Sequence, residues 1–349
     1  MKKSQKKIIW QLTYIIVTFL VIFFMGFLDP EFQTLSKSLS RMQPIWLLCA
    51  AGGILGFWFV QGGILKFIAK FVDSEISYSR SLKITIVGEY YSAITPFSSG
   101  GQPMQMAYYK RYNVSLAKSS AILAIRMIGY TSALCLVFII TMALRGRSIY
   151  ENHQVIFWMT LIGFFINAAI VAFIICILVN KRLIERIGCA IINFITRFRW
   201  FKKKREKMQA SFDKGVKEFS DAGVYLREKK LRCILTILYS LLSVLFLYSI
   251  TYCIYRSMGL NTESYVTLFT MQTFLYLAVA FVPTPGAIGA SEGGFYLFFA
   301  GIFPQSSLYL AMLLWRFFTY YANLLVGAVV VISDEVINAV RSRKKSVTD

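Results

Sequence analysis

TPFSSGGQPMQ, residues 95–105, interrupts a chain that is otherwise dominated by long runs of Leu, Ile, Val and Phe. Pro removes a backbone donor and Gly weakens a helix, so the stretch predicts a break between two helical segments. The chain is 57% hydrophobic. Several apolar runs approach the ~20 residues that cross a ~30 Å hydrocarbon core. The break is therefore expected at membrane depth, in an all-α polytopic membrane protein.

Six apolar runs are long enough to be full membrane spans. They cover about 8–28, 45–65, 116–144, 155–180, 231–255 and 305–332. Two further apolar segments, 82–94 and 264–282, each stop at a break, and the second break is PTPGAIGASEGG (283–294). A short second helical piece follows each break, at about 102–112 and 291–303. We therefore expect six full spans and two re-entrant helical hairpins, about eight membrane segments in all.

Charge asymmetry predicts the orientation of these segments, because cytoplasmic loops are enriched in Lys and Arg. The formal net charge is +21. The basic segments are the N-terminus, 66–83, 110–118, 181–232 and 341–345. All of them lie on the cytoplasmic side only if the first hairpin enters and leaves from the inside, and the second from the outside. Both termini are then expected in the cytoplasm.

The two breaks resemble each other in sequence. Their shared pattern is a Thr-Pro pair, an Arg 30 or 31 residues after the Pro, and a Tyr four residues after the Arg. Its members are Thr95, Pro96, Arg126 and Tyr130 in the first half, and Thr284, Pro285, Arg316 and Tyr320 in the second. The pattern favours an inverted repeat, about 8–144 and 155–332 in a single domain over 1–349, as in many secondary transporters. The alternative is two ordinary extramembrane loops, since Pro and Gly also punctuate loops.

Four ionisable residues fall within the predicted membrane region: Glu89, Arg126, Glu292 and Arg316. Each costs at least ~2.5–3.5 kcal/mol at a helix centre, so each is expected to face the protein interior and to serve function. A guanidinium fork suits a lipid phosphate, and our hypothesis assigns that group to both arginines. The glutamates would hold the arginines, bind a cationic head group or carry a coupling proton. Alternatively, the Glu–Arg pairs are structural ion pairs that hold the repeats together.

The breaks supply the rest of the candidate lipid-binding site. Helix ends at a break present free N–H groups and a partial positive charge, which suit an anionic group. Beyond the four charged residues, the candidates are Pro96, Gly100, Gly101, Gln102, Tyr130, Pro285, Gly286, Gly289 and Tyr320. Non-helical backbone at this depth needs surrounding protein or a watery cavity, because unpaired amides in hydrocarbon are costly.

Other features argue against catalysis and for a membrane surface as partner. The six cysteines are scattered without a CxxC pair and the only histidine is His153, so no catalytic residue, metal site or cofactor is expected. The segment 181–232 is basic, with an apolar stripe at helical spacing. The stripe consists of Met208, Phe212, Val216 and Phe219. Such a helix is expected to lie on the anionic inner leaflet, and its charge needs no nucleic acid as partner.

Two longer motifs resemble a known family. They are AITPFSSGGQPMQ followed by KSSAILAIR, and PTPGAIGASEGGF followed by LLWRFFTYYANLLVG. Both are similar to the transmembrane flippase-like domain of the bacterial lysylphosphatidylglycerol synthases, which include the multiple peptide resistance factor. The resemblance covers essentially the whole chain, and its second motif, through Glu292 to Arg316, is the more specific one. It implies a lipid flippase of the bacterial cytoplasmic membrane that moves an anionic or aminoacylated phospholipid between leaflets.

In full-length members of that family, a separate soluble domain makes the aminoacylated lipid. The sequence ends shortly after its last predicted span, so we expect that domain to be absent and the chain not to be an enzyme. Many relatives carry acidic residues near Gln102 and in place of Gly129, which suggests a different lipid substrate here. The alternative is a membrane subunit of a phosphatidylglycerol lysyltransferase or glycolipid synthase system that contributes to cationic-peptide resistance. A non-transporting scaffold, a homo-oligomer and a separate lipid-modifying enzyme as partner also stay open.

Overall fold

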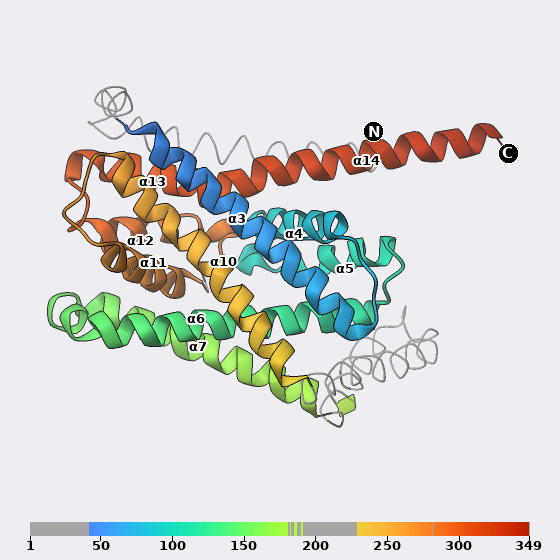
Figure 1. Cartoon of the computed structure of the whole chain (residues 1–349), viewed down its shortest axis with the longest axis horizontal. Coiled ribbons are helices and arrows are strands. Elements are labelled where there is room, and N and C mark those ends of the chain that lie inside the picture. The colour runs from blue at the N-terminus through green and yellow to red at the C-terminus, as the bar shows by residue number, and fades with distance from the viewer. Residues whose placement is uncertain are drawn as a thin grey trace.

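The computed structural model describes residues 42–180, 229–280 and 282–348, together with 182, 185, 186 and 190. Within these residues the secondary structure is all-helical, and the helices pack into one bundle from which the last helix projects (Figure 1). The predicted first span at 8–28 and most of the basic segment 181–232 lie outside the described residues. Their expected roles stay predictions.

Five helical segments in the described part of the chain are long and apolar enough to cross a membrane. They are α3 (Pro44–Ala69), α6 (Leu116–Asn152), α7 (Gln154–Val179), α10 (Lys230–Ser257) and the run of α13 (Gln305–Arg316), a π-helical turn (Phe317–Tyr321) and α14 (Ala322–Thr348). They confirm the predicted spans other than the first as helices of spanning length. α6 is longer than predicted. It continues through the exposed pair Arg147 and Glu151 as far as Asn152, so that only His153 separates it from α7.

Both predicted breaks are present, and each separates two short helices. α4 (Tyr78–Ala93) and α5 (Gly101–Arg111) flank the turn η2 (Pro96–Ser98), whereas α11 (Tyr265–Val279) and α12 (Ala290–Phe299) flank the turn η4 (Pro285–Ala287). At ~1.5 Å per residue, the 16 residues of α4 extend only ~24 Å, less than the ~30 Å of a hydrocarbon core. The other three helices are shorter still.

The first hairpin, α4 to α5, begins and ends at the same end of the bundle. The carboxylate of Asp334 on α14 lies 2.6 Å from Nζ of Lys83, near the start of α4. The same carboxylate lies 2.9 Å from Nη1 of Arg111, the last residue of α5. α4 therefore runs toward the break and α5 returns from it.

The second hairpin, α11 to α12, opens at the opposite end. Tyr255 of α10 pairs its hydroxyl with Thr262, just before α11, at 2.7 Å. The ring of Tyr255 packs edge-on against Phe303, just after α12, with 5.3 Å between centroids. α3 begins at this same end of the bundle, because the amide of Gln43 donates to the carbonyl of Ser257, the last residue of α10, at 2.8 Å. α3 then runs to the end where the first hairpin opens, since α4 follows it closely in the chain. In Figure 1, α11 and α12 lie on one side of α10, and α4 and α5 lie on the other.

The apolar core has two main parts, one around each hairpin. Phe274 of α11 and Phe295 of α12 are completely buried in one part, and Tyr109 of α5 in the other. α7 contributes little to either, because only 17% of its most apolar stretch is buried. A helix that is apolar all round and mostly uncovered is expected to face lipid.

Candidate lipid-binding site

The two breaks share one backbone conformation. The residue after the Pro is left-handed in both turns: Phe97 has φ 53° and ψ 20°, and Gly286 has φ 61° and ψ 18°. The next residues match as well, with φ 53° at Ser98 and 51° at Ala287. Their amides donate to the carbonyl of the preceding Thr at 3.2 Å and 3.0 Å. The internal similarity in sequence thus extends to the backbone.

The second turn requires glycine at position 286. A positive φ is costly for a residue with a Cβ, and the ring of Tyr320 already occupies the space that a Cβ would take. Phe97 adopts nearly the same angles in the first turn, and this positive φ is strained for a bulky residue. Phe97 is also exposed, at 62% of its full surface. η2 and η4 pack against each other, so the tips of the two hairpins meet.

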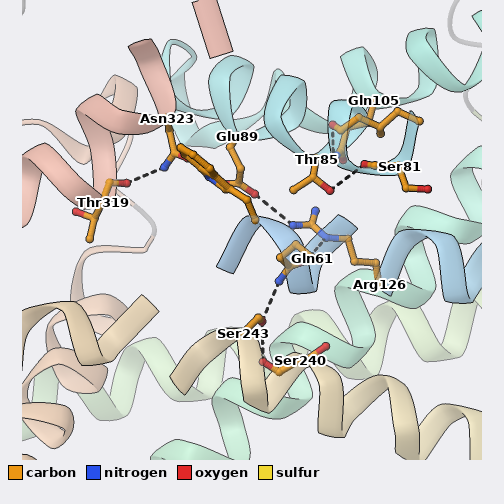
Figure 2. Close-up of polar contacts among 12 residues, drawn as sticks. Gln61, Ser81, Thr85, Glu89, Gln105, Arg126, Ser240, Ser243, Thr319 and Asn323 are labelled. Carbon is orange, nitrogen blue, oxygen red and sulfur yellow. Dashed lines mark hydrogen bonds and ion pairs between the residues drawn. The ribbon is translucent and has the colours of Figure 1, made fainter. Parts of the chain in front are cut away.

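The first charged pair lies where α4 and α6 face α3, as Figure 2 shows. Nη2 of Arg126 on α6 donates to Oε1 of Glu89 on α4 at 3.3 Å. Nε of the same guanidinium donates to Oε1 of Gln61 on α3 at 2.9 Å. Gln61 is completely buried, and its Nε2 donates to Oγ of Ser243 on α10 at 3.1 Å. One carboxylate and one neutral amide therefore hold this guanidinium.

The second charged pair joins α13 to the start of α12. Nε of Arg316 lies 2.7 Å from Oε1 of Glu292, although its N–H is not aligned for a hydrogen bond. Nη2 of Arg316 donates to the carbonyl of Gly286 at 3.1 Å, and the ring of Tyr320 lies 4.4 Å from the guanidinium carbon. The other carboxylate oxygen of Glu292 accepts from the amide of Gly289 at 2.6 Å. This pair holds the turn η4 in place.

The two pairs differ in exposure. The side chains of Arg316 and Glu292 are each 5% exposed, whereas those of Arg126 and Glu89 are 19% and 23% exposed. The helix ends beside them differ too: Glu292 neutralises the first turn of α12, but the first turn of α5 carries no acidic residue. The first half therefore presents a positive group that an incoming anion can reach.

The two repeat tyrosines each reach the hairpin of the opposite half. The hydroxyl of Tyr320 donates to the carbonyl of Ala93, at the end of α4, at 3.2 Å. Tyr130 packs against the same small apolar cluster as Tyr276 of α11. Both tyrosines therefore join the two halves of the bundle.

The remaining predicted residues lie at the breaks. Pro96 and Pro285 begin the turns, Gly100 and Gly101 lie where α5 starts, and Gly289 precedes α12. A Cβ at Gly101 would collide with the hydroxyl of Ser92, so the start of α5 packs tightly on the end of α4. Gln102 is exposed, and its side chain donates to Sδ of Met127 at 3.3 Å. This contact joins the start of α5 to α6 at the residue that follows Arg126.

Sequence reasoning missed three polar residues of this network. Gln61 and Ser243 support Arg126, and Asn323 of α14 accepts from Nε1 of Trp58 at 2.7 Å. Asn323 also donates to the carbonyl of Thr319 at 2.8 Å (Figure 2). Each is a polar side chain inside an apolar helix, and that pattern is the signal that could have found them.

Comparison with known proteins identifies relatives. Residues 10–327 match the family described as the lysylphosphatidylglycerol synthase TM region. The chain is also similar to a UPF0104 membrane protein of Archaeoglobus fulgidus, at 25% identity over 292 residues, which cover 81% of this chain and 85% of the relative. The family match includes both hairpins and both charged pairs, and it confirms the resemblance seen in the motifs.

Proposed function

The chain belongs to the lysylphosphatidylglycerol synthase transmembrane family, and on this premise we propose that it moves phospholipids between the leaflets of a cell membrane. The proposed cargo has an anionic or aminoacylated head group, as in lysylphosphatidylglycerol. The observation that carries the proposal is the partly exposed Glu89–Arg126 pair inside an apolar, multi-pass bundle. Ionisable groups in such a place are expensive and are expected to serve transport or binding.

The two hairpins are proposed to be re-entrant and to approach each other from opposite leaflets. Their helices are too short to span the core, and each hairpin returns to the end of the bundle where it began. The tips meet through η2 and η4. Opposed broken helices of this kind form the substrate sites of transporters built from inverted repeats. We also propose that the two halves form an inverted repeat, as their sequence similarity indicates. Both termini are proposed to lie in the cytoplasm, as the distribution of charge indicates.

Arg126 is the proposed contact for the lipid phosphate. Its guanidinium is partly exposed, and the start of α5, which carries a partial positive charge, contacts the same helix through Gln102 and Met127. The carboxylate of Glu89 contacts Arg126 at 3.3 Å, a long distance for a charge-assisted hydrogen bond. A phosphate can therefore share the guanidinium, and Glu89 is then free to bind the amine of an aminoacylated head group.

Arg316 is assigned a holding role instead. It is 5% exposed, and its charge already faces Glu292 while Nη2 binds the carbonyl of Gly286. A phosphate would have to displace both groups from a buried position, which is costly. The sequence suggested a phosphate contact at both arginines. We now propose this contact for Arg126 alone.

Transport of fluorescent phosphatidylglycerol in vesicles that contain the purified protein tests the proposal. The wild type should move the lipid faster than protein-free vesicles do. Arg126→Lys keeps the charge but loses the planar fork, and it should slow transport by about tenfold. Arg147→Lys is the matched control, because the Arg147 side chain is 92% exposed, and it should match the wild type. Movement no faster than in protein-free vesicles would overturn the proposal.

A further inference from the structure

Gln61 holds Arg126 without neutralising it. In the second half of the chain, Nε of Arg316 faces the carboxylate of Glu292 at 2.7 Å. In the first half, the corresponding Nε of Arg126 donates to the amide oxygen of Gln61 at 2.9 Å, and the carboxylate of Glu89 lies at Nη2 instead. The same edge of the guanidinium therefore faces a charge in one pair and a neutral group in the other.

Ser243 determines how the Gln61 amide is oriented. The hydroxyl of Ser243 donates to the carbonyl of Ser240 at 2.7 Å, and a hydroxyl has only one proton to donate. Ser243 can therefore only accept from Gln61, so the NH₂ group of Gln61 faces Ser243 and its oxygen faces Arg126 (Figure 2). The amide cannot flip without breaking both contacts.

Burial makes this arrangement stiff. Gln61, Ser240 and Ser243 are all completely buried, and they connect α3 to α10 beneath the guanidinium on α6. Hydrogen bonds are stronger at low local dielectric, and an unpaired buried amide is costly there. The plane of the Arg126 guanidinium is thereby fixed, with its Nη edge turned toward Glu89 and its Nε edge occupied.

We infer that Gln61 is a positioning residue that sets the anion preference of the head-group site. Its neutral hydrogen bond orients Arg126 without adding a second carboxylate to the guanidinium, so that a lipid phosphate competes only with Glu89 for the positive charge. A carboxylate at position 61 beside that of Glu89 would give the site a net negative charge and repel the phosphate. This inference rests on the proposed function, because it refines the site at which the head group is expected to bind. The ligand class is a phospholipid whose whole head group is net negative, as in phosphatidylglycerol.

Two substitutions separate charge from position. Gln61→Glu keeps the shape and the acceptor but adds a second carboxylate to the guanidinium, and Gln61→Leu removes both hydrogen bonds. Native mass spectrometry of the purified protein measures its preference for phosphatidylglycerol over phosphatidylcholine. Both variants should lose about tenfold or more of that preference, the factor for one hydrogen bond to a charged group. Adding Glu89→Gln to Gln61→Glu restores a single carboxylate and should recover most of the preference.

Gln272→Leu is the matched control. Gln272 is also a buried amide, and its Oε1 accepts from the hydroxyl of Thr251 at 2.6 Å between α10 and α11, where it supports no charged group. Gln272→Leu should lower the melting temperature about as much as Gln61→Leu does, but it should keep the wild-type lipid preference. If Gln61→Leu does not fold, Gln61→Glu and its double variant still decide the question.

The outcomes separate this inference from the proposed function. A wild type without preference for phosphatidylglycerol, or a folded Gln61→Glu that keeps the wild-type preference, overturns the inference. Selective binding that is lost in Gln61→Glu supports the inference. If such binding is found but vesicles show no lipid transport, the transport function fails while the head-group site stands.

Discussion

The ring of Tyr320 lies against Gly286 and fills the space that a side chain there would need. The same ring lies 4.4 Å from the guanidinium carbon of Arg316, which in turn binds the carbonyl of Gly286 through Nη2. The hydroxyl of Tyr320 extends to the carbonyl of Ala93 at 3.2 Å. One tyrosine thus joins the turn of the second hairpin to the end of the first.

Gly286→Ala should destabilise the protein markedly. A Cβ at φ 61° costs about 1–2 kcal/mol, and overpacking against Tyr320 adds about 1–3 kcal/mol. We expect a clear fall in the melting temperature of the detergent-purified protein. Gly293→Ala is the control, because no heavy atom lies within 4 Å of a Cβ built there, and it should be neutral or slightly stabilising. Equal melting temperatures for the two variants would show that the turn is looser than described.

Arg316→Gln should lower the yield of folded protein. It leaves the buried carboxylate of Glu292 without its cation, which costs about 3–5 kcal/mol. Adding Glu292→Gln removes the orphaned charge and should restore the yield. The measurement is the folded fraction in size-exclusion chromatography of fluorescently tagged protein. Arg126→Gln should leave that fraction closer to the wild type, because its partner Glu89 is partly exposed. Normal folding of Arg316→Gln would contradict the holding role.

Cysteine labelling should place the ends of the two hairpins on opposite membrane faces. In a chain without its native cysteines, Asn261→Cys and Gly301→Cys flank the second hairpin, and Arg80→Cys and Lys110→Cys lie in the first; all four positions are exposed. We expect the first two to react with an impermeant maleimide in intact cells, and the other two only after permeabilisation. Reaction of Asn261→Cys and Gly301→Cys from different sides would mean that the second hairpin crosses the membrane and is not re-entrant.

Much of the fold could be predicted because its signals are local. A Pro cannot donate a backbone hydrogen bond wherever it stands, so Pro96 and Pro285 marked the breaks without knowledge of their neighbours. A charge in an apolar segment needs an opposite charge, so Glu–Arg pairing was among the expected arrangements. The expectation that such pairs join the two repeats was wrong, because Glu89 pairs with Arg126 within the first half and Glu292 with Arg316 within the second. α6 proved longer than hydropathy predicted, since hydropathy does not detect a polar helix end.

The sequence by itself determined which of the described segments are helical, where the two breaks lie and which charges fall inside apolar segments, because these depend on residues close together in the chain. Only the tertiary structure decided that Arg316 is closed off while Arg126 stays partly exposed. Helix packing also decided that Gln61 of α3 contacts the Arg126 guanidinium and that Ser243 of α10 holds Gln61. The physical reason is that exposure and hydrogen-bond partners are set by which helices lie around a side chain, and these helices are far apart in the sequence.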